Sequence, residues 1–320
     1  MTSLPALSSS ETLAAYNTLH KQLAQFIKGQ DDTLHYILSC YFTGHHVLLE
    51  DFPGTGKTTL AKTLAQLISQ AAFKRVQFTP DLLPSDITGV NIFDPTERTF
   101  RFHQGPLFCD ILLADEINRA SPRTQSALLE AMAENQITIE GETYPLAKHF
   151  FVIATQNPVE FRGTYPLPEA QMDRFGIQCS LGYISANEEL SLLNEFLQHE
   201  KNQTEIQAIK PEQLEAISAA IDEIHVADNL KSYVIDLISA TRSHGDVSLP
   251  LSPRATLTIV KVAQALAFTQ GSEFVTASHI KQLAPYALSH RLMLKNASQN
   301  TTDGKQAFIA NLLETISVPG

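Results

Sequence analysis

A glycine-rich loop between an apolar run and a helix-like stretch is the first place where the residue types suggest chemistry. It follows residues 45–50 and reads Asp51-Phe52-Pro53-Gly54-Thr55-Gly56-Lys57-Thr58-Thr59. Such glycines let successive backbone N–H groups turn inward around phosphate oxygens, and the following helix N-terminus adds partial positive charge. Lys57 supplies a charge for the β and γ phosphates, and Thr58 a hydroxyl ligand for Mg²⁺. The loop predicts binding of ATP with Mg²⁺; the alternative is a strand-to-helix turn without nucleotide.

One position of this loop departs from the general phosphate-loop signature. Asp51 stands where the signature has glycine. Aspartate tolerates a positive φ better than most residues, so the bend can form. Because a carboxylate repels phosphates, we expect the Asp51 side chain to face solvent.

Two adjacent carboxylates could turn binding into hydrolysis. The apolar run 111–114 ends in Asp115 and Glu116. At a strand tip beside the loop, Asp115 can hold Mg²⁺ through water, and Glu116, on the other face of the strand, can polarise an attacking water. The next apolar run ends in Gln156-Asn157-Pro158, where the Asn157 amide could orient the same water or only begin a turn.

Hydrolysis also needs positive charge at the γ-phosphate beyond Lys57, commonly from an arginine of a neighbouring subunit. Arg174 precedes the last strand-like run, from which its guanidinium can reach a subunit edge. Arg254 opens a helix after the cap Ser252, so it is a candidate sensor of nucleotide state. Each arginine could instead form a surface ion pair. Arg119 and Arg123 are candidates for contacting a neighbouring subunit or capping the next helix.

Short strand-like runs alternate with helix-like stretches as far as about residue 180. The runs are apolar on successive residues, which is typical of parallel strands covered by helices on both faces. They comprise residues 45–50, 75–79, 111–114, 150–155 and 177–181. Helices are expected at 58–72 and 123–135, the second with a Ser121-Pro122 start. The pattern predicts an α/β fold with a parallel five-stranded sheet.

Other segments depart from this alternation. Residues 90–103 and 137–146 alternate in side-chain character around a turn, so each predicts a β-hairpin outside the sheet. After residue 185 only helical patterns follow, at 187–198, 211–224, 230–243, 253–269, 277–289 and 305–316. We therefore predict two domains: residues 1–184, an α/β nucleotide-binding core with an N-terminal helical segment, and residues 185–320, which are all-helical.

Composition excludes several classes of protein. The 320 residues are 43% hydrophobic and 18% charged with a net charge of -11, which fits a folded chain and neither a disordered one nor a coiled coil. The acidity disfavours nucleic-acid binding, and no apolar run reaches the ~18 residues of a membrane span. Cys40, Cys109 and Cys179 are too widely spaced for a zinc or disulfide framework. We expect a cytoplasmic protein.

Together these residues resemble the AAA+ ATPases, and more closely the MoxR family. The resemblance covers nearly the whole chain and rests on residues 27–30, 51–59, 115–122, 125–132, 154–158, 164–175 and 252–255. It implies a core followed by a helical lid, two inserted β-hairpins and a homo-oligomeric ring, usually hexameric. Asp51 is similar to a variant seen in this family.

The resemblance also implies roles for single residues. Asp115 and Glu116 correspond to the Walker B residues, Asn157 to sensor 1, Arg174 to the arginine finger and Arg254 to sensor 2. Ile27 and Gly29 would line the adenine pocket.

Family members act as chaperone-like motors, often with a partner that carries a von Willebrand factor A domain. The leading hypothesis is therefore an ATP-hydrolysing remodeller of partner proteins or metalloenzyme complexes. Two alternatives stay open, the motor subunit of a metal-chelatase-like complex and a nucleotide-gated scaffold with little turnover. A DNA-translocating motor is disfavoured by the charge of -11 and by hairpins that are not distinctly basic.

Overall fold

A five-stranded parallel sheet is the centre of the computed structural model, which describes residues 8–157, 165–197 and 206–318. The strand order is β2 (Phe73–Gln77), β5 (Ile111–Asp115), β8 (Phe151–Gln156), β1 (His46–Glu50) and β9 (Phe175–Cys179). Every neighbouring pair is parallel, so the predicted sheet is confirmed. The segments that follow β1, β5 and β8 therefore meet at one edge of the sheet, its carboxyl edge.

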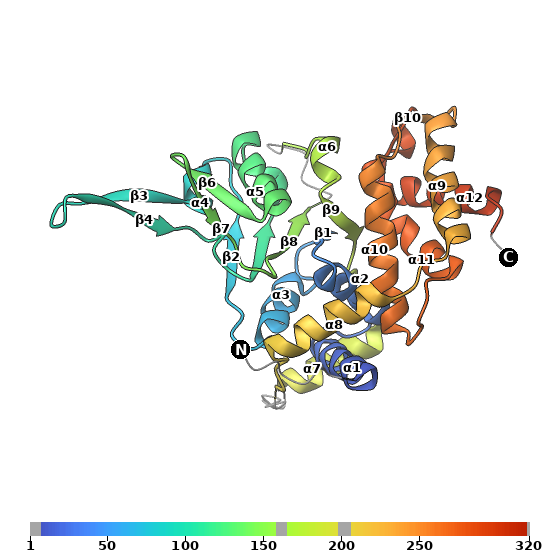
Figure 1. Cartoon of the computed structure of the whole chain (residues 1–320), viewed down its shortest axis with the longest axis horizontal. Coiled ribbons are helices and arrows are strands. Elements are labelled where there is room, and N and C mark those ends of the chain that lie inside the picture. Colours follow the sequence, from blue (N-terminus) through green and yellow to red (C-terminus); the bar gives the residue numbers. More distant parts are fainter. Residues whose placement is uncertain (1–7, 158–164, 198–205, 319–320) are drawn as a thin grey trace.

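Helices cover both faces of this sheet (Figure 1). On one face lie α1 (Ser9–Phe26), α2 (Asp31–Phe42) and α3 (Lys57–Gln66), and on the other α4 (Pro84–Thr88) and α5 (Pro122–Glu134). Strand β1 shows the alternation, because Val47 and Leu49 pack into the first core and Leu48 into the second. Strands β1, β5, β8 and β9 are buried nearly throughout, whereas the edge strand β2 is mostly exposed.

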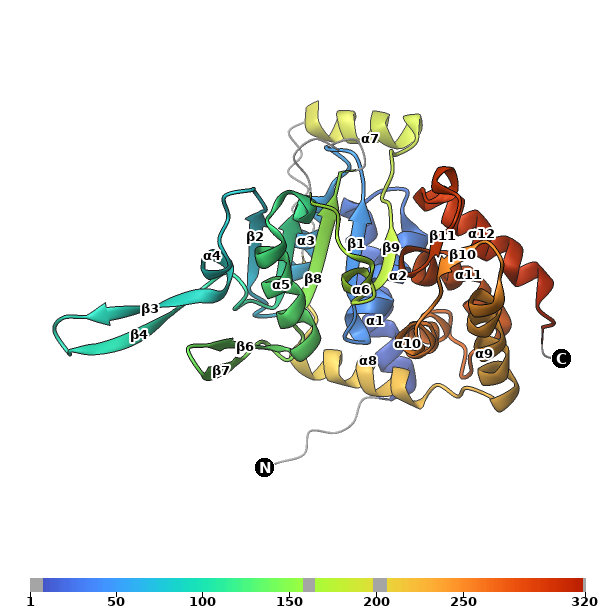
Figure 2. The same ribbon diagram turned by 90° about the horizontal axis from the view of Figure 1, so that it is seen from above.

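Both predicted hairpins form and extend away from the sheet (Figure 2). The longer pairs β3 (Gly89–Asp94) with β4 (Thr99–Gln104), and the shorter pairs β6 (Gln136–Ile139) with β7 (Glu142–Pro145). The ring of Phe102 stacks on that of Tyr144 with centroids 4.3 Å apart, so the two hairpins contact each other near the base of the longer one. Beyond this contact, Phe93 and Phe100 of the longer hairpin are exposed.

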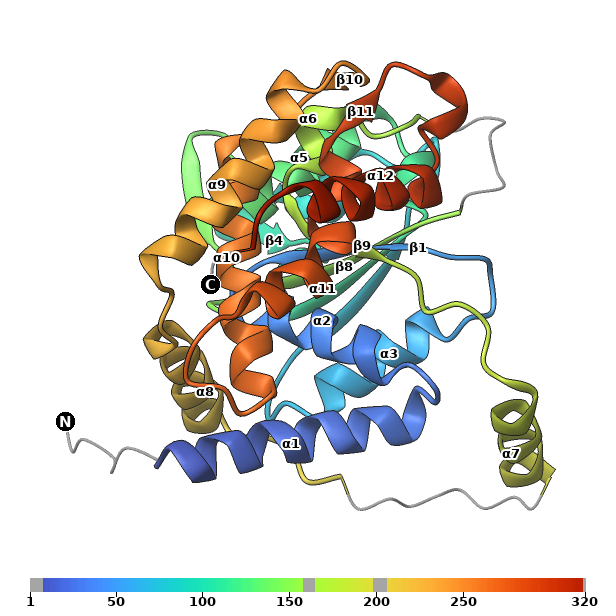
Figure 3. The ribbon, with the colours of Figure 1, turned by 90° about the vertical axis from the view of Figure 1, so that its right-hand side faces the viewer.

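The C-terminal part is helical, as expected, apart from a short ribbon of β10 (Val247–Leu249) and β11 (Met293–Leu294). After the short α6 (Glu169–Met172) its helices are α7 (Ala186–Leu197), α8 (Pro211–Glu223), α9 (Asp228–Ser243), α10 (Pro253–Thr269), α11 (Ala277–Leu288) and α12 (Thr302–Thr315). Helix α7 stands apart from the others (Figure 3). Helix α10 packs on α2, and one hydrophobic core runs from the sheet into these helices. The domain division at 184/185 stays a prediction.

Some boundaries differ from those predicted. Strands β2 and β9 begin two residues earlier than expected, and α3 ends at Gln66 rather than at residue 72. Helix α3 stops because the chain then pairs with a distant segment: Ile68 forms a parallel bridge with Ile209. Two residues of the family-like strings, Pro158 and Thr164, lie outside the described residues. All three cysteines are free and buried, and no helix in the described ranges is both long and apolar enough to cross a membrane.

Candidate functional site

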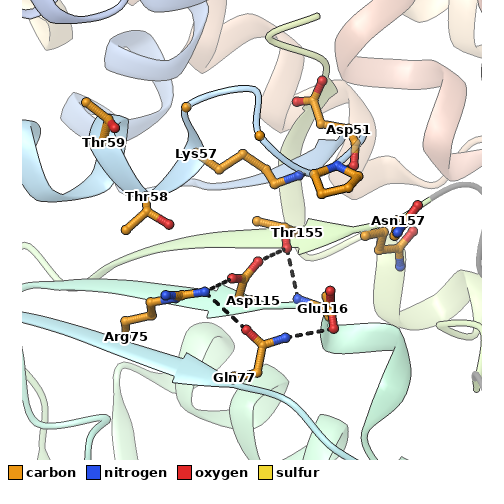
Figure 4. A pocket seen from close by; sticks show the side chains of 14 residues that line it. Asp51, Lys57, Thr58, Thr59, Arg75, Gln77, Asp115, Glu116, Thr155 and Asn157 are labelled. Atoms are coloured by element: carbon orange, nitrogen blue, oxygen red, sulfur yellow. Dashed lines mark hydrogen bonds and ion pairs between the residues drawn. The ribbon is translucent and has the colours of Figure 1, made fainter. Parts of the chain in front are cut away.

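A cavity of ≈ 400 Å³ opens at the carboxyl edge of the sheet (Figure 4). Its lining comes from the loop after β1, the start of α3 and the ends of β2, β5 and β8. The lining residues are Asp51, Pro53, Gly54, Gly56, Lys57, Thr58, Thr59, Arg75, Gln77, Asp115, Glu116, Thr155, Gln156 and Asn157. The cavity therefore brings together most of the phosphate loop, both predicted acidic residues and the Asn157 amide.

The phosphate loop has the backbone geometry that its glycines predict. Gly54 and Gly56 have φ values of 89° and 92°, in the left-handed region that glycine enters without steric cost. Gly56 immediately precedes α3, so Lys57 is the first residue of that helix. The Lys57 Nζ donates to the carbonyl oxygens of Asp51 at 3.1 Å and Phe52 at 2.8 Å. The ammonium thus lies against the loop backbone, at the wall of the cavity.

The expectation that Asp51 faces solvent is wrong, because its side chain is 2% exposed. One carboxylate oxygen accepts from the Ser180 hydroxyl at 2.7 Å and the Gly182 N–H at 3.0 Å, and the other accepts from the Leu181 N–H at 2.9 Å. The Asp51 φ is not positive, and its N–H donates to Gln156 O at 3.2 Å. Asp51 therefore prolongs β1 and ties it to the segment after β9.

The two acidic residues reach the cavity by different routes. Asp115 ends β5, and Glu116 follows it with φ 56° and ψ 49°, a left-handed conformation that is uncommon outside glycine. This turn brings the Glu116 carboxylate back to the cavity that Asp115 lines. The expectation that Glu116 points to the other face of the strand is therefore wrong. The predicted proximity of the two carboxylates to the phosphate loop is confirmed.

Thr155 connects this acidic pair to β8, and no motif in the sequence pointed to it. Its hydroxyl donates to Asp115 Oδ1 at 2.7 Å and accepts from the Glu116 N–H at 2.8 Å. The residue is 1% exposed, so both hydrogen bonds are shielded from water. One side chain thus fixes the Asp115 carboxylate and the turn at Glu116.

Three more side chains that the prediction did not place here hold the acidic pair, and two of them, Arg75 and Gln77, are drawn in Figure 4. The Arg75 Nη2 donates to Asp115 Oδ2 at 2.7 Å and to Gln77 Oε1 at 3.2 Å. The Gln77 Nε2 donates to Glu116 Oε2 at 2.7 Å, and the Arg119 Nη1 to the same oxygen at 2.9 Å. Alternating polar residues on β2 were the available signal for Arg75 and Gln77, but only the sheet order places them beside β5.

Three predicted nucleotide contacts do not line the cavity. Thr55 belongs to the loop, but its hydroxyl donates to Phe52 O at 3.3 Å. Ile27 is buried close to Gly56, so it lies behind the loop. Gly29 has φ 70°, and a side chain there would collide with the Glu188 carboxylate of α7. An adenine pocket around Ile27 and Gly29 therefore stays a prediction.

Arg174 and Arg254 also lie away from this cavity. Arg174 precedes β9, whose first residue Phe175 pairs with His46 at the start of β1, while the phosphate loop follows the end of β1. Four steps of a parallel strand, at about 3.3 Å each, separate these ends by roughly 13 Å. Arg254 is exposed at the start of α10.

The two arginines are nevertheless close to each other, because Asp173 joins their segments. The Ser252 Oγ, at the N-cap of α10, donates to Asp173 Oδ2 at 2.9 Å, and the buried Arg291 Nε lies 2.9 Å from Asp173 Oδ1. Asp173 precedes Arg174 directly, and Ser252 lies two residues before Arg254. The segments that carry the two arginines thus meet near the start of β9, at the end of the sheet away from the chain's own cavity.

The side chains of the cavity fit a magnesium–nucleotide. Mg²⁺ is usually bound through one or two protein oxygens together with phosphates and water. The Thr58 hydroxyl and the Asp115 carboxylate supply such oxygens, and both line the cavity beside Lys57 and the loop glycines. Among the described residues no cluster of three or more His, Cys, Asp or Glu could hold a metal by itself. The donor set therefore suits a cation that arrives with phosphate.

Comparisons with known proteins agree with this geometry. Residues 46–177 match the ATPase family associated with various cellular activities (AAA), and residues 239–310 match the AAA lid domain. The chain is 36% identical to "Chaperone MoxR1" of Mycobacterium tuberculosis, over 97% of this chain and 85% of that protein. It is 43% identical to the uncharacterized protein YeaC of Bacillus subtilis, over 91% of each. A crystal structure of a protein assigned as an ATPase, from Cytophaga hutchinsonii, superposes with a TM-score of 0.87 and 34% identity, covering 98% of this chain and 97% of that one.

Proposed function

The chain belongs to the MoxR family of AAA+ ATPases and is an ATP hydrolase, and we propose that it is a ring-forming, chaperone-like remodeller of partner proteins. The observation that carries the proposal is the separation of Arg174 and Arg254 from the acidic pair. A subunit with its hydrolytic carboxylates at one edge and its arginines at the other can complete a neighbour's site and not its own. The name of the M. tuberculosis relative supports the chaperone-like role.

Each residue of the cavity has a part in this proposal. Lys57 exchanges its contacts with the loop carbonyls for the β and γ phosphates, while Pro53, Gly54, Thr55, Gly56 and Thr59 shape the loop. Thr58 and Asp115 hold the metal. When held there, Mg²⁺ would supply positive charge to offset the charge that develops on the phosphate oxygens. Glu116 orients and polarises the attacking water, and Asn157 helps to place it.

The arginines come from the adjacent subunit. Arg174 is half-buried, and its guanidinium has five N–H donors, of which one on Nη1 donates to Ala170 O at 3.3 Å. It therefore has donors left for a phosphate, and we assign it as the trans-acting finger. Arg254, on the same surface, reports the neighbour's nucleotide state to α10. Asp173, through its hydrogen bond from Ser252, holds together the two segments that carry them.

We further propose the assembly and setting that this function requires. The ring is a homo-oligomer, taken to be a hexamer, and it works with a protein carrying a von Willebrand factor A domain and with protein clients. The buried free thiols of Cys40, Cys109 and Cys179 suit a reducing compartment, so we propose the cytoplasm.

A subunit-mixing experiment tests this function. Glu116→Gln should keep ATP binding and lose turnover, and Arg174→Ala should lose turnover because a trans arginine contributes ~10³–10⁵ in rate. Mixing the two variants should restore part of the phosphate release, since a Glu116→Gln chain lends its intact Arg174 to a neighbour with an intact Glu116. Lys21→Ala, which removes an exposed charge of α1, is the control and should match the wild type.

Two results would contradict the proposal. Hydrolysis at the wild-type rate by Glu116→Gln would remove the assigned role of that carboxylate. A mixture that binds nucleotide but stays inactive would exclude Arg174 as the trans-acting group.

A further inference from the structure

The Arg75 guanidinium forms an ion pair with Asp115, the carboxylate that we propose as a ligand of Mg²⁺. Both oxygens of Asp115 have partners, Oδ1 the Thr155 hydroxyl at 2.7 Å and Oδ2 the Arg75 guanidinium at 2.7 Å. The Asp115 side chain is 13% exposed, so water gives it little alternative solvation. The negative charge that Asp115 would offer to Mg²⁺ is therefore already paired with the Arg75 guanidinium.

The position of Arg75 follows from the edge strand β2. The register pairs Arg75 with Leu113 and Gln77 with Asp115, so the arginine side chain runs along the strand to the carboxyl edge. Strand alternation puts Lys74 and Val76 on the opposite face. Arg75 is 47% exposed and has solvent on one side, so its side chain is free to swing away without disturbing the core.

The same guanidinium group is also linked to the Glu116 carboxylate, through the side chain of Gln77. The Arg75 Nη2 donates to Gln77 Oε1 at 3.2 Å, and Gln77 Nε2 holds Glu116 Oε2 at 2.7 Å. Removing the Arg75 guanidinium would therefore take away a hydrogen bond of Asp115 directly, and it would free the Gln77 amide that holds Glu116.

We propose that Arg75 is a tethered counter-ion that competes with Mg²⁺ for Asp115 and thereby sets the magnesium dependence of nucleotide binding. Two cations a few ångströms apart repel, so the metal can bind Asp115 only when the guanidinium leaves. The fraction of subunits in which Arg75 has left scales the apparent affinity for metal. Arg75 is thus a positioning residue, because it acts through Asp115. The inference rests on the proposed role of Asp115 as a metal ligand.

The test measures binding rather than turnover. Mg²⁺ is titrated into full-length protein with a fluorescent, non-hydrolysable ATP analogue, and a parallel arm contains EDTA. In Arg75→Gln the half-saturating Mg²⁺ concentration should fall roughly three- to tenfold, the size expected for a charged hydrogen bond that is partly screened by solvent. Binding in EDTA should match the wild type.

Two variants separate charge competition from other effects. Lys74→Gln removes a neighbouring positive charge from the opposite face and should leave the titration unchanged. Arg75→Lys keeps the charge and should give a half-saturating concentration closer to the wild type than to Arg75→Gln.

The outcomes distinguish this inference from the proposed function. A wild-type protein that binds no nucleotide in either arm would defeat both. Magnesium-dependent binding in the wild type with an unchanged titration in Arg75→Gln would overturn the counter-ion alone. If Arg75→Gln bound nucleotide more weakly both with Mg²⁺ and in EDTA, Arg75 would be a phosphate ligand. If Arg75→Lys and Arg75→Gln shifted the half-saturating Mg²⁺ concentration equally, the charge of Arg75 would not matter. Either result overturns the inference.

Discussion

At the scale of single residues, Thr155 determines the geometry of the acidic pair. Its hydroxyl is both the donor to Asp115 and the acceptor for the N–H of Glu116. Because Glu116 holds a left-handed conformation that costs about 1–3 kcal/mol, a neighbouring acceptor for its N–H is needed to keep the turn in place. Mutation of groups of this kind, which orient a metal ligand without touching the metal, typically lowers metal affinity or activity by roughly 10- to 100-fold.

Replacing Thr155 by valine should therefore slow ATP hydrolysis. Thr155→Val keeps the volume but leaves Asp115 Oδ1 and the Glu116 N–H without this partner, so kcat should fall roughly 10- to 100-fold. Nucleotide affinity in EDTA should be kept. Thr155→Ser retains the hydroxyl and should recover most of the rate. Full activity of Thr155→Val would show that the turn at Glu116 holds without this hydroxyl.

At the scale of elements, the carboxylate of Asp51 joins β1 to the segment after β9. It accepts from one hydroxyl and two backbone N–H groups of residues 180–182, and Leu181 is 1% exposed. Next to it, the ring of Phe52 stacks on that of Tyr183 with centroids 6.0 Å apart. The phosphate loop is thus fixed to the chain that leads into α7.

Removing this carboxylate should destabilise the protein. Asp51→Ala leaves buried N–H groups without an acceptor, at a cost of about 1–3 kcal/mol in the free energy of unfolding. Asp51→Gly restores the general phosphate-loop signature and should lose at least as much. Asp236→Ala, at an exposed position of α9, is the control for urea denaturation. An unfolding midpoint that does not move in Asp51→Ala would mean that the contacts of Asp51 contribute nothing to stability.

Elements with a strong local signal were predictable, and elements shaped by distant contacts were not. Buried runs such as β1 and β5, and helix α5 with its Ser121 cap, have their signal within a few residues. Helix α3 ends early because of pairing with Ile209, which no local pattern shows. The phosphate loop, Asp115, Glu116 and Asn157 could be placed from motifs and strand order, whereas Arg75 depends on which strand neighbours β5.

At the scale of the whole molecule, buried neutral histidines link the core to pH. Burial lowers the pKa of His45 and His46 to about 4, and it lowers the pKa of His290 well below its usual value. His46 Nδ1 accepts from the Val152 N–H at 3.1 Å, so protonation there would break a contact between β1 and β8. The folded state therefore excludes protons that an unfolded chain would take up.

Stability should accordingly fall in mild acid. Since the unfolded chain binds protons near pH 6.5 and the folded chain only near pH 4, stability is complete above pH 6.5 and declines as the pH falls toward 4. Each such histidine contributes up to about 1.4 kcal/mol per pH unit in that window. The measurement is Tm between pH 7.5 and 5. His103→Gln, at an exposed position, should leave the profile unchanged, and a Tm that is constant over this range would refute the assignment.

The distance between the cavity and the surface of Arg174 and Arg254 has a consequence for how mutations there behave genetically. If each subunit completes its neighbour's site with Arg174, a chain that lacks Arg174 keeps its own nucleotide-binding residues. The neighbouring chain, however, loses the arginine that its hydrolysis requires. In a cell that makes intact and damaged copies together, each damaged copy would silence an intact one. Lesions on this surface should therefore behave as dominant alleles.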